Sequence, residues 1–119
     1  MKVPSFLLKK LYVKGSLKNT EDGFEFTIKN VLMDGTITAP IDLTVDNRLL
    51  PQETITITAQ GTSRLVTEIS EADPAPLKVD VEVVVAVKGK NLAPGEHELE
   101  VAAVTKEYGD IRFSIKDSL

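Results

Sequence analysis

A single histidine and the absence of cysteine limit the chemistry open to this 119-residue chain. Without thiols, the sequence excludes disulfides, a cysteine nucleophile and zinc sites of the usual kind. A histidine-dependent mechanism would have to use His97. That residue follows the turn at Pro94-Gly95 and shares its parity along the strand with Leu99 and Val101, so we expect its side chain to point inward. The sequence therefore predicts a structural His97 rather than a catalytic one.

Acidic side chains in one loop region suggest a second chemistry. Glu68, Glu71 and Asp73 lie close together in the sequence, and oxygen ligands on a loop are what Ca²⁺ prefers. The cluster lacks the regular D-x-D-x-D-G spacing of a calcium loop. Pro74 and Pro76 already indicate a solvated loop, so no metal site is predicted.

Paired carboxylates are the third candidate chemistry. Glu98 and Glu100 lie on one face of a predicted strand, with Cα atoms about 6.6 to 6.8 Å apart. Such pairs can hydrolyse glycosides, but the chain has no tryptophan on which a sugar could stack. The glycines fall in turns, and none belongs to a phosphate-binding loop. We therefore predict a solvated strand surface, no cofactor and no enzymatic activity.

The elements that would position these residues are predicted to be strands. Apolar and polar residues alternate from about residue 10 to residue 116, which is the period of a half-buried β-strand. The clearest hairpin joins 11–18 to 24–29, with Asp22-Gly23 expected to supply the positive φ of its turn. A turn at Gln60-Gly61 leads into a strand that should carry Leu65, Thr67 and Ile69 on one face. Further strands are expected at 41–46, 53–59, 63–70, 79–87, 99–103 and 111–115.

Two segments do not follow this alternation. The loop EADPAP, residues 71–76, is rich in acid and proline, so we expect few buried backbone partners and tolerance of insertions after Ala75. At the N-terminus, Phe6, Leu7 and Leu8 could form a short helix capped by Ser5. The same residues could equally continue the first strand backwards, so both alternatives stay open.

Short strands separated by turns are typical of all-β sandwiches and barrels. We predict a single domain over residues 1–119, an all-β Greek-key β-sandwich of seven or eight strands, with a short N-terminal helix or arm. The motif L-A-P-G-x-H-x-L-x-V at Leu92 to Val101 resembles the turn before a late strand in immunoglobulin-like sandwiches. This resemblance implies an immunoglobulin-like fold, in which His97 takes the place of the aromatic residue at the corner.

The whole chain also resembles a group of small archaeal proteins, some of which are labelled hydroxymethylglutaryl-CoA reductase. The resemblance implies a relationship to that enzyme's family. A hydride-transfer enzyme needs a larger chain and a glycine-rich dinucleotide loop, and this sequence has neither. The activity itself is therefore not expected.

Apolar residues on the wrong side of two strands point to an interface. Val84 and Ala86 fall on the face marked by Glu82, while Ala102 and Val104 continue the face of the two glutamates described above. If the two strands are neighbours, as sequential strands often are, these four residues form one apolar patch on an outer face. We expect the N-terminal arm of Phe6, Leu7 and Leu8, a second copy of the chain or another protein to cover it.

Composition narrows the class of partner. The net charge is −4, with 14 basic and 18 acidic residues, which argues against a nucleic acid or a membrane surface. No segment approaches the ~18 apolar residues of a membrane span, and the start MKVPSFLLKKLYV lacks the features of a secretory signal. The cysteine-free composition favours a cytoplasmic protein, and the abundance of Lys and Glu leans toward a thermophilic source.

These observations favour a non-catalytic β-sandwich module for protein–protein interaction or self-assembly, such as a homodimer. The alternative is a small-ligand-binding domain that uses loops 71–76 and 88–97, which we expect to cluster at one end of the sandwich.

Overall fold

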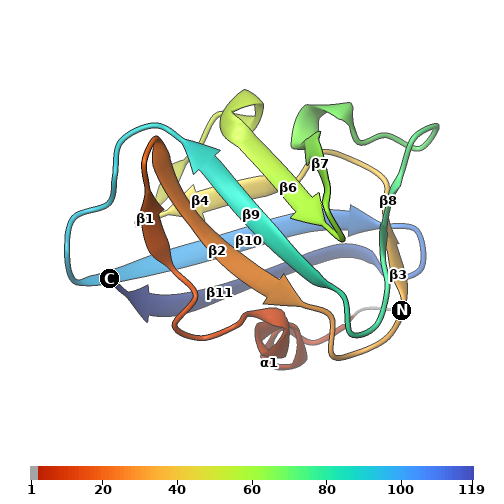
Figure 1. The fold of residues 1–119 in the computed structure, drawn as a ribbon. Helices are drawn as coiled ribbons and strands as arrows, with labels where there is room; N and C mark the ends of the chain where they lie inside the picture. The colour runs from red at the N-terminus through yellow and green to blue at the C-terminus, as the bar shows by residue number, and fades with distance from the viewer. Residues whose placement is uncertain (1–2) are drawn as a thin grey trace.

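Two antiparallel β-sheets make up most of the molecule and pack face to face (Figure 1). The structure is a computed structural model that describes residues 3–119. In order, the first sheet consists of β1 (Lys18–Thr20), β2 (Gly23–Lys29), β9 (Glu82–Lys88), β6 (Ile55–Ala59) and β7 (Thr62–Leu65). The second sheet consists of β5 (Arg48–Leu49), β4 (Asp42–Val45), β10 (Glu96–Thr105), β3 (Gly35–Ile37) and β8 (Ala75–Leu77), and β11 (Gly109–Ser118) pairs with β10. Residues 3–119 thus hold eleven strands, more than the seven or eight expected, and the prediction of an all-β fold is confirmed.

The core between the sheets follows from the alternation in the sequence. Every second residue of each long strand points inward, because successive side chains in a strand face opposite sides. On β10 and β11 the register pairs Leu99 with Ile115, Val101 with Phe113 and Ala103 with Ile111, which is the pairing that their apolar pattern predicts. The main inward rows are Phe24, Phe26 and Ile28; Leu43 and Val45; Ile55 and Ile57; Val83, Val85 and Val87; and Leu99, Val101 and Ala103.

Two tight turns have the residues that their geometry demands. Asp46 and Asn47, between β4 and β5, both have positive φ, at 50° and 67°. Gln60 and Gly61, between β6 and β7, have φ of 51° and 82°. Two consecutive positive φ values define the turn whose twist matches that of the strands it joins. The predicted turn at Gln60-Gly61 is therefore confirmed.

The first hairpin differs from the prediction in two ways. Gly23 does not have positive φ; it opens β2, and a Cβ at this position would collide with the carbonyl oxygen of Val87 on β9. The glycine is required for this close approach and not for the turn. In addition, of the predicted segment 11–18 only Lys18 belongs to a strand, because β1 begins there, and Tyr12 makes a single isolated bridge to Ile28.

The strand predicted at 63–70 ends early. After β7 the chain enters a 3-10 turn at Val66–Glu68, which changes the direction of successive side chains. As a result Val66 and Ile69 are buried, while Leu65 and Thr67 face solvent. The expected row of Leu65, Thr67 and Ile69 on one face is therefore wrong.

The N-terminal segment is helical. Helix α1 (Ser5–Leu8) continues into a 3-10 turn at Lys9–Leu11 and packs against β11 (Figure 1). Pro4 is the N-cap residue and no side chain caps the helix, so the expectation that Ser5 is the cap is wrong. Leu8 and Leu11 are buried in the core.

The loop EADPAP is anchored rather than free. Arg64 on β7 donates hydrogen bonds to the carbonyl oxygens of Pro74, at 3.0 Å, and Asp73, at 2.9 Å, and forms an ion pair with the Asp73 carboxylate at 3.1 Å. Ala75 is buried, begins β8 and pairs with Ile37. The expectation of few buried backbone partners is wrong, and an insertion after Ala75 would divide a strand.

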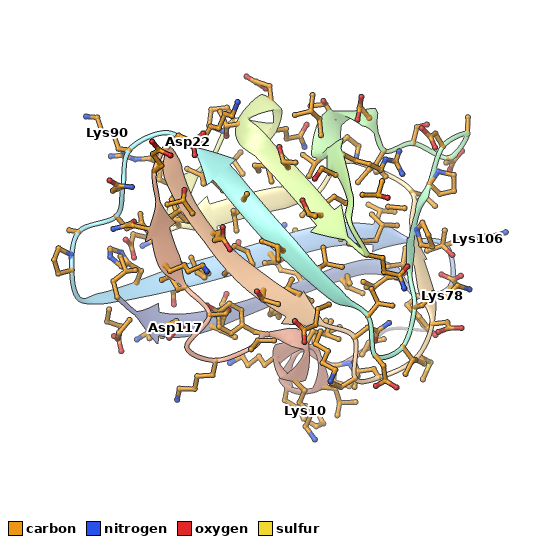
Figure 2. The ribbon with its side chains drawn as sticks, in the orientation of Figure 1. Lys10, Asp22, Lys78, Lys90, Lys106 and Asp117 are labelled. Carbon is orange, nitrogen blue, oxygen red and sulfur yellow. The ribbon has the colours of Figure 1, made fainter. Side chains whose placement is uncertain are left out.

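On the opposite side of the sandwich, Asp117 connects the last strand to the N-terminal part of the chain. One of its carboxylate oxygens accepts the Tyr12 hydroxyl at 2.6 Å and the backbone N–H groups of Gly15 at 3.0 Å and Leu17 at 3.3 Å. The other accepts the N–H of Ser118 at 2.9 Å. These hydrogen bonds connect the last strand to the segment that follows the N-terminal helix, and Figure 2 labels Asp117 on that strand.

Candidate functional site

His97 occupies the corner where β10 begins, and its side chain exposes only 11% of its surface. Its Nδ1 lies 2.7 Å from an Asp46 carboxylate oxygen, and its Nε2 lies 2.7 Å from the Ala93 carbonyl oxygen. The second Asp46 oxygen accepts the backbone N–H of Glu98 at 2.9 Å. The prediction that His97 is mostly buried is confirmed.

Both ring nitrogens of His97 therefore face hydrogen-bond acceptors. An imidazole can satisfy two acceptors only when both nitrogens carry a proton. The Ala93 carbonyl, and after it the Asp46 carboxylate, accordingly raise the pKa of His97 above its usual value. The His97 hydrogen bond likewise lowers the pKa of Asp46. When it is protonated, His97 links two turns through both ring nitrogens, and neither nitrogen is free to take a substrate proton.

The carboxylates weighed as candidate sites in the sequence have structural partners. Glu100 is engaged by Arg112 at 3.0 Å and by the Ser114 hydroxyl at 3.4 Å. In the loop region, one Glu68 carboxylate oxygen accepts the Leu65 N–H at 3.1 Å, and Asp73 pairs with Arg64 as described above. Within residues 3–119, no group of three histidine, aspartate or glutamate side chains is arranged to hold a metal ion.

The four predicted patch residues divide between the two sheets. Val84 and Ala86 lie on β9 in the first sheet, and Ala102 and Val104 lie on β10 in the second. β9 and β10 follow one another in the chain but belong to different sheets, so the two pairs are not neighbours. The assumption that all four form one patch is wrong.

Val84 and Ala86 are half-buried by their own sheet. Val84 stands between Thr27 and Thr58, and Ala86 stands between Glu25 and Thr56. In the central strand of a five-stranded sheet, these side chains cover much of one another's surface. The outward residues of β9 are explained by this packing.

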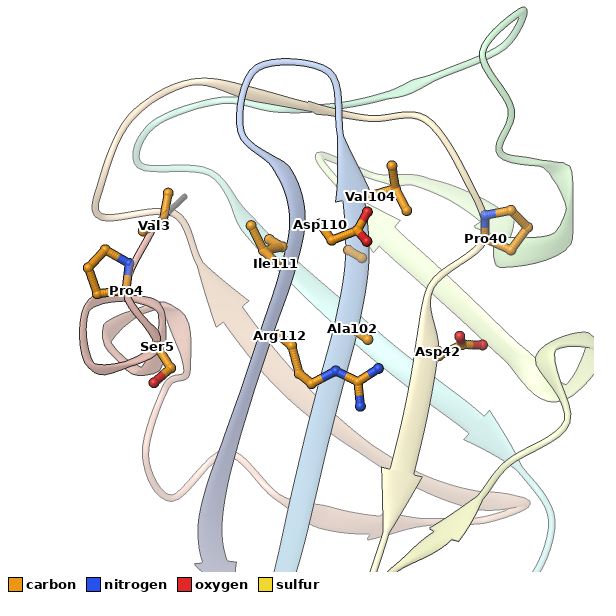
Figure 3. A pocket seen from close by; sticks show the side chains of 11 residues that line it. Val3, Pro4, Ser5, Pro40, Asp42, Ala102, Val104, Asp110, Ile111 and Arg112 are labelled. Carbon is orange, nitrogen blue, oxygen red and sulfur yellow. The ribbon is translucent and has the colours of Figure 1, made fainter. Parts of the chain in front are cut away.

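Ala102 and Val104 belong to a groove on the outer face of the second sheet (Figure 3). The groove has a volume of about 640 Å³. The arm residues 3–5 form one wall, beyond β11, and Pro40 with Asp42 forms the other. Val104 remains 38% exposed on the floor, and Phe6 on α1 is 68% exposed. Of the predicted covering residues, Leu8 is instead part of the core and Leu7 is half-buried.

A second hollow lies between the sheets. It has a volume of about 330 Å³ and is lined mainly by aliphatic side chains, among them Ile28, Ile57 and Val83 from the first sheet and Ile37, Val101 and Ala103 from the second. These six core residues keep 7–9% of their surface exposed, whereas Phe26, Ile55 and Leu99 elsewhere in the core keep none. The core is therefore loosely filled at this end.

Small side chains contribute to this cavity. Ala59, Ala75 and Ala103 converge on it from three different strands, whereas the two buried phenylalanines of β2 do not line it. At about 24 cal/mol per Å³, an empty volume of this size costs at most about 8 kcal/mol, which is comparable with a typical net stability of ~5–15 kcal/mol. The fold thus leaves open a volume that larger side chains would fill.

The two loops expected to form a ligand site lie far apart. Loop 71–76 precedes and enters β8 at one end of the sandwich, while loop 88–97 joins β9 to β10 at the other (Figure 1). The latter contacts the β1–β2 hairpin, where Asn91 donates to the carbonyl oxygens of Thr20 and Gly23. The expectation that they cluster at one end is wrong.

Several residues of these sites could not be identified from the sequence pattern. Arg64 reads as an ordinary surface residue, because its partners are backbone carbonyls, and the partners of Asp117 lie about 100 positions away in the sequence. The alanines of the cavity read only as small core residues. A lone arginine opposite a loop rich in acid and proline could have indicated the Arg64 anchor, and a carboxylate with the same parity as the inward Ile111, Phe113 and Ile115 could have indicated Asp117.

Comparison with known protein families gives a match over most of the chain. The family described as hydroxymethylglutaryl-CoA reductase, N-terminal domain, matches residues 7–119. No curated protein matches the chain. Among residues 3–119, no helix is both long and apolar enough to cross a membrane.

Proposed function

Since this chain belongs to the hydroxymethylglutaryl-CoA reductase N-terminal domain family, we propose that it is a non-catalytic module whose task is to contact another protein. The family is named for the N-terminal domain of an enzyme. Support for a non-catalytic role comes from His97, the chain's single histidine, both of whose nitrogens are occupied by structural hydrogen bonds.

The outer-face groove carries this proposal. Its floor contains Ala102 and the exposed Val104, and the wall formed by residues 3–5 leads directly into α1 with the projecting Phe6. Exposed apolar side chains of this size next to a concave surface are typical of protein contacts. Residues Ala102, Val104 and Phe6 of the predicted interface are thus retained, and Val84 and Ala86 are not needed.

A second copy of the chain is the partner that this surface fits. The projection and the groove lie side by side on one molecule, so two copies related by a twofold axis could each place Phe6 in the groove of the other. Such a contact is self-complementary and closes into a dimer. Aromatic anchors in pockets supply much of the energy of protein interfaces.

Sedimentation equilibrium over a wide range of protein concentration tests the proposal. We expect the wild-type mass to exceed that of a monomer as concentration rises, and both Val104→Glu and Phe6→Ser to shift the equilibrium to the monomer. The control is Val84→Glu, which places the same charge on the outer face of the other sheet and should leave the mass unchanged. A wild type that stays monomeric at every concentration would show that self-assembly is wrong.

Two further features belong to the proposal. The absence of cysteine supports a cytoplasmic setting, which stays a prediction. The immunoglobulin-like Greek-key arrangement also stays a prediction, supported by two antiparallel sheets around one core. Ligand binding through loops 71–76 and 88–97 together is not proposed again, because the loops lie at opposite ends.

A further inference from the structure

The cavity between the sheets opens at one side of the sandwich. Its lining includes the exposed residues Gln60 and Thr62, near the first sheet's edge strand β7, and Pro76 and Lys78, near the second sheet's edge strand β8. Neither of these edges pairs with another strand within residues 3–119. Exposed residues at the lining mean that the cavity reaches solvent between β7 and β8.

The interior of the cavity suits an aliphatic group. Apart from Phe113, the buried side chains that line it are isoleucine, valine, leucine and alanine. Apolar cavities in proteins stay dry and accept apolar molecules. The volume of about 330 Å³ is at the small end of the range for ligand pockets, and it equals the liquid volume of about eleven water molecules. A compact aliphatic chain is therefore the class of molecule that fits.

The mouth of the cavity carries two basic side chains. Arg64 and Lys78 are the charged residues of the lining, and no acidic side chain belongs to it. Arg64 is already committed to three carbonyl oxygens and to Asp73. Lys78 is exposed, and its contact with Asp34 is a long ion pair of 3.8 Å at the surface, which contributes little. Figure 2 shows Lys78 at this end of the molecule.

We propose that this cavity is a binding site for a small aliphatic molecule with one anionic head group. The aliphatic chain would lie between Ile57 and Val83 on one sheet and Ala103 on the other, and the head group would meet Lys78 at the mouth. The cavity shares the lining residues Ala103 and Ile111 with the groove, but the groove opens on the outer face of the second sheet and the cavity lies between the sheets. Of the two loops 71–76 and 88–97, only the beginning of β8, at Ala75 and Pro76, lines the cavity.

Titration of the wild-type protein with octanoate, followed by methyl NMR and calorimetry, tests the site directly. We expect saturable binding and a melting temperature that rises with octanoate. The shifted methyl groups should be those of Ile28, Ile57 and Val83, while those of Leu43 and Leu99 at the filled end of the core stay in place. No saturation, or shifts spread evenly over both ends, would overturn the proposal.

Matched variants test the two halves of the site. Ala103→Leu should fill the cavity and abolish octanoate binding, while Ala86→Leu, the same change on an outer face, should bind as the wild type does. Ala59→Leu, which narrows the cavity from β6, serves the same purpose if Ala103→Leu does not fold. A filled variant that folds and still binds with wild-type affinity would overturn the proposal.

The head group is tested by charge. Lys78→Gln should weaken octanoate binding by about two- to fivefold, as expected for an exposed ion pair, and leave the binding of the neutral octanol unchanged. The control is Lys88→Gln, at the far end of β9, which should change neither affinity. Equal losses for octanoate and octanol in Lys78→Gln would contradict the assigned role of the lysine.

Discussion

At the scale of single residues, His97 makes stability depend on pH. Its hydrogen bonds to the Ala93 carbonyl and to Asp46 raise its pKa in the folded protein. Stabilisation by a group whose pKa is raised on folding is fully present below the unfolded pKa of about 6.5, and is lost as the pH rises through the folded pKa. We therefore expect the free energy of unfolding to fall across this window in urea titrations.

His97→Phe is the variant that checks this expectation. The ring fills the same corner but leaves the Ala93 carbonyl without its donor and Asp46 without its cation, so the variant should lose about 1–2 kcal/mol at mildly acidic pH. The loss should shrink at alkaline pH, where the wild type has lost its charged histidine. A difference in unfolding free energy between the variant and the wild type that stays constant across this pH range would contradict a stabilising role of protonated His97. The sequence interpretation, which treated His97 as a plain aromatic plug, missed this charge because Asp46 lies 51 positions away.

At the scale of elements, Arg64 holds β8 and the loop before it against β7. Arg64→Met keeps the aliphatic stem and removes the hydrogen bonds to the Glu68, Asp73 and Pro74 carbonyls. We expect a loss of about 1–3 kcal/mol in denaturant titrations and faster amide exchange in β8. Arg112→Met is the matched control, because Arg112 makes an exposed pair with Glu100 and should change stability by less than about 1 kcal/mol. Equal effects of the two variants would show that the loop does not depend on Arg64.

Most strands could be predicted from the sequence, but which strands pair with one another could not. Alternation within β2, β6 and β10 is a property of each strand's own residues, so the inward rows could be read directly. Which strands pair depends on contacts between distant segments, and the assumption that β9 and β10 are neighbours failed for that reason. The role of Gly23 was likewise hidden, since it depends on the carbonyl of Val87 on another strand.

The candidate sites show the same limit more strongly. The groove could be anticipated only through Ala102 and Val104, because their outward parity is local. The cavity could not be anticipated, since it arises where Ala59, Ala75 and Ala103 meet from three strands. A missing volume is a property of the assembled core and has no counterpart in the pattern of any one strand.

At the scale of the whole molecule, Asp117 joins residues that are about 100 positions apart. Burial alone would raise the pKa of Asp117, but the hydrogen bonds from Tyr12, Ser118, Leu17 and Gly15 outweigh it and lower the pKa. The stabilisation from a carboxyl group with a lowered pKa is present above its unfolded value of about 3.9, and is lost as the pH falls through the folded pKa. Acid should therefore loosen the tie between the last strand and the segment after α1.

Asp117→Asn tests whether this tie makes residues 1–119 one cooperative unit. An amide cannot carry the charge or accept all of the carboxylate's hydrogen bonds, so the variant should lose about 2–4 kcal/mol of unfolding free energy at neutral pH. Its stability should also change less than that of the wild type as the pH is lowered. Asp110→Asn, on the exposed face of the same strand, should behave as the wild type. In the wild type, the ring NMR signals of Tyr12 and the far-ultraviolet circular dichroism should report unfolding in one coincident transition. Two separate transitions would mean that the N-terminal segment unfolds independently and that the chain is not a single domain.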